Sequence, residues 1–187
     1  MTIFFTAYTH FGHQNIIRHC KRPWKSAQEM NEELQHRWNA IVGPHDTVYH
    51  LGDLGFGNAK RMEPLLPLLR SLRGKKRLVP GNHDSYGALT SYQGIFEILP
   101  ALTEISSPAR ISLCHYPMMT WNRSHHGSYM FHGHSHGVFF PASGRFDVGV
   151  DAWNYKPVAF EELEEYQRLF TEQKMRVFES YPCWGFS

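Results

Sequence analysis

The sequence contains no run of apolar residues that approaches the roughly 18 needed to span a bilayer. Its first five residues have neither the basic flank nor the cleavage pattern of a signal peptide. The three cysteines, Cys20, Cys114 and Cys183, are odd in number and show no CxxC spacing, which argues against a disulfide framework or a thiolate zinc site. We therefore expect a soluble protein in the reducing cytoplasm, with no membrane partner.

The chain also has little excess of either sign of charge, because its formal net charge is only +2. This balance attracts anions weakly, so it disfavours nucleic acid as a partner without excluding it. No internal repeat, low-complexity tract or Gly/Ser-rich linker interrupts the chain, and residues 1–187 are expected to form a single domain. The oligomeric state stays open between a monomer and a homodimer.

Short apolar segments alternate with helical patterns in the first half of the chain. Buried strands are predicted at 3–8, 47–51, 77–79 and 110–114. An S-x-x-E capping box at Ser26 and Glu29 begins one helix. Further helices are predicted at 160–170 and at 59–72, where Pro64 and Pro67 must shorten or kink the helix. This alternation predicts an α/β fold.

The second half is richer in strand-like segments, at 96–98, 102–105, 129–132 and 145–150, without long helices between them. Parallel neighbours need long crossover connections, so this pattern favours two mixed sheets packed face to face, with helices outside. An aromatic tail, residues 178–186, is expected to pack on the domain or on a second subunit.

Histidine is abundant, with 13 in the chain, and several histidines follow predicted strands. Loops at the carboxyl ends of strands in layered α/β proteins converge on one crevice, so we expect these side chains to meet. Imidazole nitrogens and hard oxygens without sulfur suit manganese, iron, zinc or nickel. The expected metal ligands are His10, Asp53, Asn82, His115, His134 and His136.

This set is large enough for two divalent ions that share the Asp53 carboxylate. One ion would take His10 and His136, and the other would take the remaining three ligands. A water held between the ions would lose a proton near neutral pH and become a hydroxide nucleophile, for which phosphate esters are the obvious target.

His83 and Asp84 are the expected catalytic residues outside the ligand set. His83 follows ligand Asn82 and is placed to protonate the departing alkoxide as general acid. Asp84 either orients the His83 ring or forms the turn, and the sequence favours neither role.

Substrate contacts are expected from residues near these loops. A basic segment follows the first loop, and the loop at 121–126 is expected to lie over the metals, where Trp121 could stack a nucleobase. The candidates are His13, Arg18, Arg22 and Arg123.

The motifs resemble the calcineurin-like metallophosphoesterase superfamily, whose pattern is D-x-H, G-D, G-N-H-[DE], a lone His and G-H-x-H. Gly81-Asn82-His83-Asp84 and Gly133-His134-Ser135-His136 carry the resemblance. The stretches THFGHQNI and VGVDAWNYKPV are similar to small members, without a cap domain, from bacteria and phages. The resemblance implies a four-layer α/β/β/α sandwich, a two-metal centre, and hydrolysis of phosphodiesters or phosphomonoesters of small, nucleotide-like substrates.

The chain departs from this pattern at Tyr8, which aligns with the first aspartate of the family. Three consequences are open. Tyr8 ligates ferric iron as tyrosinate, or it leaves a weakly bound first ion completed by water, or it suppresses turnover. The last consequence makes a metal-binding protein without activity the alternative to an enzyme.

Overall fold

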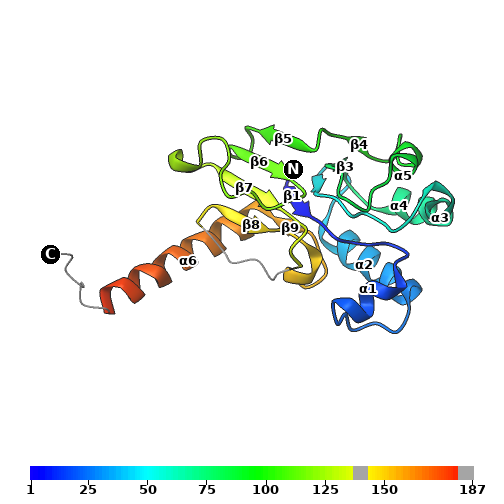
Figure 1. Ribbon diagram of the computed structural model, residues 1–187, viewed down its shortest axis with the longest axis horizontal. Coiled ribbons are helices and arrows are strands. Elements are labelled where there is room, and N and C mark those ends of the chain that lie inside the picture. Colours follow the sequence, from blue (N-terminus) through cyan, green and yellow to red (C-terminus); the bar gives the residue numbers. More distant parts are fainter. Residues whose placement is uncertain (137–142, 181–187) are drawn as a thin grey trace.

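The computed structural model describes residues 1–136 and 143–180, with side chains described up to residue 172, and its strands form two mixed sheets (Figure 1). The first sheet has the spatial order β4 (Glu97–Ile98), β3 (Lys75–Leu78), β2 (Thr47–His50), β1 (Ile3–Thr6) and β9 (Val158–Ala159). The second has the order β5 (Leu102–Ile105), β6 (Ile111–Cys114), β7 (Tyr129–His132) and β8 (Arg145–Asp147).

Both sheets combine parallel and antiparallel pairs. In the first sheet, β9 runs antiparallel to β1 while the other pairs are parallel, and in the second sheet only the β5–β6 pair is antiparallel. The sheets face one another through aromatic side chains, because the rings of Phe5 on β1 and Phe131 on β7 meet edge to face with centroids 4.7 Å apart. The prediction of two mixed sheets with helices outside is confirmed.

The predicted capping box and proline break are both present. Ser26 accepts a hydrogen bond from the backbone N–H of Glu29 and caps α2 (Ala27–Ile41). The predicted helix at 59–72 is divided into α3 (Ala59–Met62), the 3-10 helix η1 (Glu63–Leu65) and α4 (Leu66–Ser71). Pro64 and Pro67 lie at the starts of η1 and α4, where a missing N–H costs little.

Several elements were not predicted because they are short or irregular. They are α1 (Gln14–His19), α5 (Tyr86–Ser91), η2 (Ser124–His126) and η3 (Val150–Ala152). The last helix, α6 (Phe160–Ser180), is longer than predicted and extends away from the sheets at its carboxyl end (Figure 1). The predicted packing of the aromatic tail concerns side chains outside the described residues. Within the described chain, every helix is too short or too polar to cross a bilayer.

Candidate metal centre

The loops that follow five strands bring the expected residues to one place. His10 follows β1, Asp53 follows β2, and Asn82 follows β3. His115 comes directly after β6, and His134 follows β7. The first two loops are joined by backbone hydrogen bonds, including that from the His10 N–H to the Asp53 carbonyl at 3.0 Å. The predicted convergence of residues far apart in sequence is therefore present in the structure.

One half of the cluster consists of four donor atoms from Asp53, Asn82, His115 and His134. The His115 Nε2 atom lies 2.9 Å from Asn82 Oδ1, 3.3 Å from His134 Nδ1 and 3.7 Å from Asp53 Oδ2. The His134 Nδ1 atom lies 3.1 Å from Asn82 Oδ1. Ligands about 2.1 Å from a shared ion lie about 3.0 Å apart in an octahedron and about 3.4 Å apart in a tetrahedron. The separations among Asn82, His115 and His134 fit ligands of one divalent cation, whereas Asp53 Oδ2 lies farther away, at 3.7 Å from His115 Nε2.

The protonation of His115 strengthens this conclusion. Its Nδ1 atom lies 2.8 Å from the Leu51 carbonyl, which can only accept, so Nδ1 carries the proton. Burial lowers the pKa of His115 despite the nearby Asp53 carboxylate, so the ring is neutral and Nε2 is a bare lone pair. This lone pair faces the Asn82 carbonyl oxygen and an Asp53 oxygen. A lone pair that faces acceptor oxygens is unfavourable unless a cation lies between them.

Asp84 connects the two loops that supply Asp53 and Asn82. Its carboxylate accepts hydrogen bonds from the backbone N–H groups of Asp53, Gly81 and Leu54 at 2.7, 2.9 and 3.1 Å. Burial and the neighbouring Asp53 raise the pKa of Asp84 to about 6, although the amide hydrogen bonds oppose the shift. Both carboxylate oxygens are bound to backbone, which favours the loop-forming role over the alternative that Asp84 orients the His83 ring.

The backbone at the cluster is strained. Asp53, His134 and His136 have φ of 56°, 66° and 45°, in the left-handed region that side chains rarely adopt. Such conformations cost about 1–3 kcal/mol each and persist where the surrounding structure enforces them. Gly52 is also left-handed, and a Cβ there would lie 2.6 Å from His115 Nδ1. The glycines beside the ligands therefore provide room for close-packed loops, while the ligand residues themselves adopt much of the turning geometry.

The other half of the cluster contains His10 and His136. The His10 Nε2 atom lies 3.7 Å from Asp53 Oδ2, and within the part of the chain that the structure describes neither ring nitrogen of this buried histidine has a hydrogen-bond partner. Burial holds the pKa of His10 well below its usual value, so the ring is neutral near pH 7. Unpaired, buried ring nitrogens beside a carboxylate are the donor atoms expected of a metal ligand.

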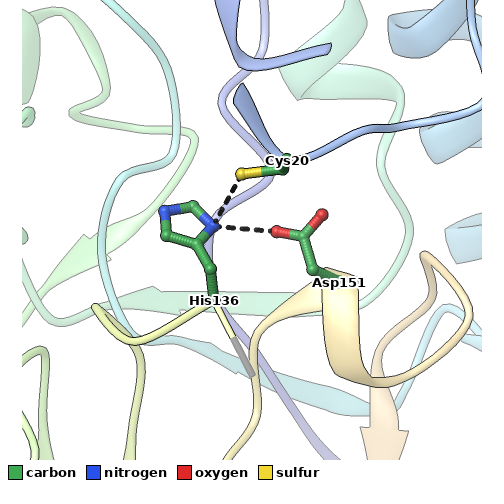
Figure 2. Close-up of side chains that lie close together, drawn as sticks. All are labelled: Cys20, His136 and Asp151. Atoms are coloured by element: carbon green, nitrogen blue, oxygen red, sulfur yellow. Dashed lines mark hydrogen bonds and ion pairs between the residues drawn. The ribbon is translucent and has the colours of Figure 1, made fainter. Parts of the chain in front are cut away.

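His136 is held from behind by two side chains (Figure 2). Its Nδ1 atom lies 3.0 Å from Asp151 Oδ2 and 3.2 Å from Cys20 Sγ. Burial opposes the charged ring, but the hydrogen bonds to Asp151 and Cys20 outweigh it and raise the pKa of His136 to about 9. The three atoms could in principle surround a cation, since they lie within 4.8 Å of one another. However, the Arg22 guanidinium binds both Asp151 oxygens, and its positive charge opposes a cation there.

Tyr8 lies between the two groups of histidines. Its side chain is fully buried, and its hydroxyl has no hydrogen-bond partner among the described residues. Its ring stacks on the His136 ring with centroids 4.1 Å apart, and it lies 5.7 Å from His10 and 5.6 Å from His115. An aromatic ring therefore occupies the space between these histidines.

His13 and His83 border the cluster with Phe56. The His13 ring stacks on Phe56 with centroids 3.8 Å apart, and lies 5.4 Å from His10 and 6.5 Å from His83. Burial and the nearby His83 lower the pKa of His13 to about 4. His83 is exposed, and its backbone N–H donates to Asp53 Oδ1 at 2.9 Å. Both histidines thus lie where a substrate would contact them, although their roles remain predictions.

The structure contradicts the predicted substrate contact for two of the three arginines. All five N–H donors of Arg22 are engaged, by Asp151, by the Tyr8 and Thr9 carbonyls and by Met30 Sδ. Arg22 is 4% exposed, so it binds the protein's own loops. Arg18 is exposed in the last turn of α1, which leaves its predicted role untested.

Arg123 lies at the opposite end of the second sheet. It lines a cavity of about 290 Å³ together with Arg110, which precedes β6, and Ser128, which precedes β7. His115 and His134, in contrast, follow the carboxyl ends of these parallel strands. The loop at 121–126 therefore does not lie over the candidate metal centre as expected, because it packs at the start of β7.

Sequence reasoning missed three residues of this region. Asp151 and Cys20 contact His136, and Phe56 stacks on His13. Cys20 was interpreted only as evidence against disulfides, and one sequence offers no periodic signal for the other two. Their positions depend on how η3 and the loop after β2 fold back on the strands, which is a tertiary property.

Comparisons with known proteins place the chain in a family with an archaeal protein. No protein-family model matches it. The uncharacterized protein MJ1445 of Methanocaldococcus jannaschii is 32% identical over 171 residues, which cover 85% of this chain and 87% of that protein. The chain therefore belongs to the same family as this archaeal protein. The gene 66 protein of Mycobacterium phage L5 is 26% identical over 179 residues, covering 80% of this chain and 86% of that protein.

One solved structure agrees on the architecture. The protein of unknown function AQ665 from Aquifex aeolicus has a TM-score of 0.68 and 26% identity, covering 88% of this chain and 98% of that chain. This similarity supports the α/β architecture with two mixed sheets. The nuclease MPE of Pseudomonas putida has a TM-score of 0.47 and 17% identity, covering 72% of this chain and 61% of that chain. A similarity at that level does not bear on activity.

Proposed function

We propose that this protein is a metal-dependent phosphoesterase of the calcineurin-like superfamily that hydrolyses small phosphodiesters or phosphomonoesters. One observation carries the proposal. The bare His115 Nε2 lone pair lies 2.9 Å from Asn82 Oδ1 and 3.7 Å from Asp53 Oδ2. His134 Nδ1 completes the group, at 3.1 Å from Asn82 Oδ1. The His10 ring nitrogens, which have no hydrogen-bond partner among the described residues, lie beside Asp53 on the other side of the cluster.

A divalent ion held by these donors supplies Lewis acidity, which polarises a phosphoryl oxygen and makes water more acidic. The protein's own part is to fix the donors. Asp84 ties the Asp53 and Asn82 loops through backbone amides, and the Leu51 carbonyl fixes the tautomer and orientation of His115. Manganese, iron, zinc and nickel all accept this nitrogen and oxygen donor set.

His83 is proposed as the general acid that protonates the leaving group. Its backbone is fixed to Asp53, and its exposed ring lies 5.5 Å from the ring of His10. An exposed ring beside the donors can reach a leaving oxygen while exchanging protons with solvent.

A small, nucleotide-like substrate is proposed, because Phe56 and His13 provide aromatic surface beside His83. Aromatic faces of this kind pack against an aryl group or a nucleobase. The net charge of +2 gives little attraction for a long nucleic acid. The free thiols of Cys20 and Cys114 support a reducing, cytoplasmic location.

Hydrolysis of bis(p-nitrophenyl) phosphate by protein loaded with manganese tests the proposal. The purified wild type should release p-nitrophenol, and Asn82→Ala should lose both manganese and turnover because one of four donors is removed. His125→Ala is the matched control, because this exposed histidine lies on η2, outside the cluster. Equal loss in both variants, or turnover that does not respond to metal, would count against the proposal.

A metal-binding protein with suppressed turnover is the second candidate. The buried ring of Tyr8 favours it, because this ring replaces a carboxylate that the superfamily pattern supplies. This candidate gains support if the wild type binds manganese through Asn82 yet releases no p-nitrophenol, while Tyr8→Asp does release it.

A further inference from the structure

We infer that this chain binds one divalent ion rather than two, at Asp53, Asn82, His115 and His134, because the Tyr8 ring fills the other position. The inference rests on the metal site of the proposed function and adds its stoichiometry. It depends on the contrast between the two halves of the cluster. One half brings together four donor atoms, while the other brings together two histidines and an aromatic ring.

The Tyr8 ring has no room to withdraw. It is fully buried, and its ring lies nearly parallel to those of His136 and His10, with interplanar angles of 20° and 18°. The backbones of Gly149 and Gly133 also lie against the Tyr8 ring. A Cβ atom added to Gly149 would lie only 2.6 Å from Tyr8 Cδ2, and one added to Gly133 would lie 3.3 Å from Tyr8 Cε2. The ring is therefore wedged between two imidazoles and two glycine backbones.

The donors left in this half are also too few. A neutral phenol is a weak ligand for a divalent cation, whereas the aspartate of the family pattern would supply a charged oxygen. One oxygen of Asp53, Oδ1, accepts the His83 N–H at 2.9 Å, and the other, Oδ2, lies beside His10. That Oδ2 atom lies 3.7 Å from both His10 Nε2 and His115 Nε2, so the two halves share this charged oxygen, and Tyr8 adds no second one.

His136 adds a second restraint on this half. Its Nδ1 atom is bound to Asp151, and Asp151 is in turn bound through both oxygens to the buried Arg22 guanidinium. The contacts with Cys20 and Asp151 hold the imidazole in this orientation (Figure 2), and its face stacks on the Tyr8 ring. His136 therefore packs the aromatic ring in place.

The experiment counts ions on intact, folded protein. Wild type, Tyr8→Phe and Tyr8→Asp are loaded with manganese, freed of excess metal and analysed by plasma mass spectrometry and by electron paramagnetic resonance. We expect one manganese per chain with an uncoupled spectrum for the first two proteins. For Tyr8→Asp we expect two manganese ions per chain with a spin-coupled spectrum, because a carboxylate then replaces the ring.

Each result decides something different. Two ions on the wild type would overturn the inference and leave the proposed function standing. One ion on the wild type but none on Tyr8→Phe would also overturn it, because the hydroxyl would then be a ligand. No ion on the wild type would instead contradict the metal site of the proposed function. A single ion on Tyr8→Asp with a native circular dichroism spectrum would show that the ring is not the obstacle. Should Tyr8→Asp fail to fold, the wild type and Tyr8→Phe still decide.

Discussion

Replacing Arg22 by methionine should destabilise the protein strongly, because this arginine joins the first loop to η3. Its guanidinium binds both oxygens of Asp151 at 2.8 and 2.9 Å and the Tyr8 carbonyl at 2.7 Å, and its side chain is 0% exposed. Removing one partner of a buried ion pair typically costs 3–5 kcal/mol. Asp151 keeps His136 as a partner, so we expect a loss near the lower end, about 3 kcal/mol.

Urea unfolding followed by tryptophan fluorescence measures this loss. With a denaturant slope of about 2 kcal/mol/M, the transition midpoint should fall by about 1.5 M. Arg168→Met is the matched control, because its ion pairs with Glu165 and Glu172 are exposed, and its midpoint should not change measurably. Equal midpoints for Arg22→Met and Arg168→Met would refute the structural role assigned to Arg22.

Three further outcomes are expected. Burial lowers the pKa of His50 to about 3, so the folded chain keeps this ring neutral while the unfolded chain takes up a proton below about pH 6.5. The free energy of unfolding should therefore fall by about 1.4 kcal/mol per pH unit as the pH falls from about 6.5 towards 3. Urea unfolding of wild type and His50→Gln at pH 7, 6 and 5 measures this difference, and parallel curves for the two proteins would contradict it. His83→Ala should slow aryl esters with poor leaving groups at least about tenfold more than p-nitrophenyl esters; equal losses would exclude His83 as the acid. Gly52→Ala should weaken manganese binding, since its Cβ would lie 2.6 Å from His115 Nδ1; unchanged affinity in a calorimetric titration would show that the loop can relax.

Much of the fold could be predicted where the local preferences of the sequence agree with the pattern of buried residues. The Ser26 cap, the proline break at 63–67 and the buried strands follow from hydrogen bonding, ring geometry and apolar periodicity. The short helices α1 and α5, with six residues each, have no periodicity long enough to recognise. The two-residue strand β9 is likewise defined only by its pairing with β1.

The candidate site was predictable to the extent that it depends on strand ends. His10, Asp53, Asn82, His115 and His134 converge because each follows a strand in one of two facing sheets. Arg22 was misassigned, and the role of Asp84 was left open, because the sequence gives the charge of a side chain and not its partner. Arg22 is neutralised by Asp151, which lies 129 residues away, and Asp84 binds backbone amides that no residue pattern reveals.

Crystals grown with manganese, with diffraction data collected at the manganese absorption edge, test the central claim most directly. The account predicts an anomalous peak within about 2.2 Å of donor atoms of Asp53, Asn82, His115 and His134. A peak at Cys20, His136 and Asp151 instead, or no peak in protein that still hydrolyses phosphodiesters, would contradict it.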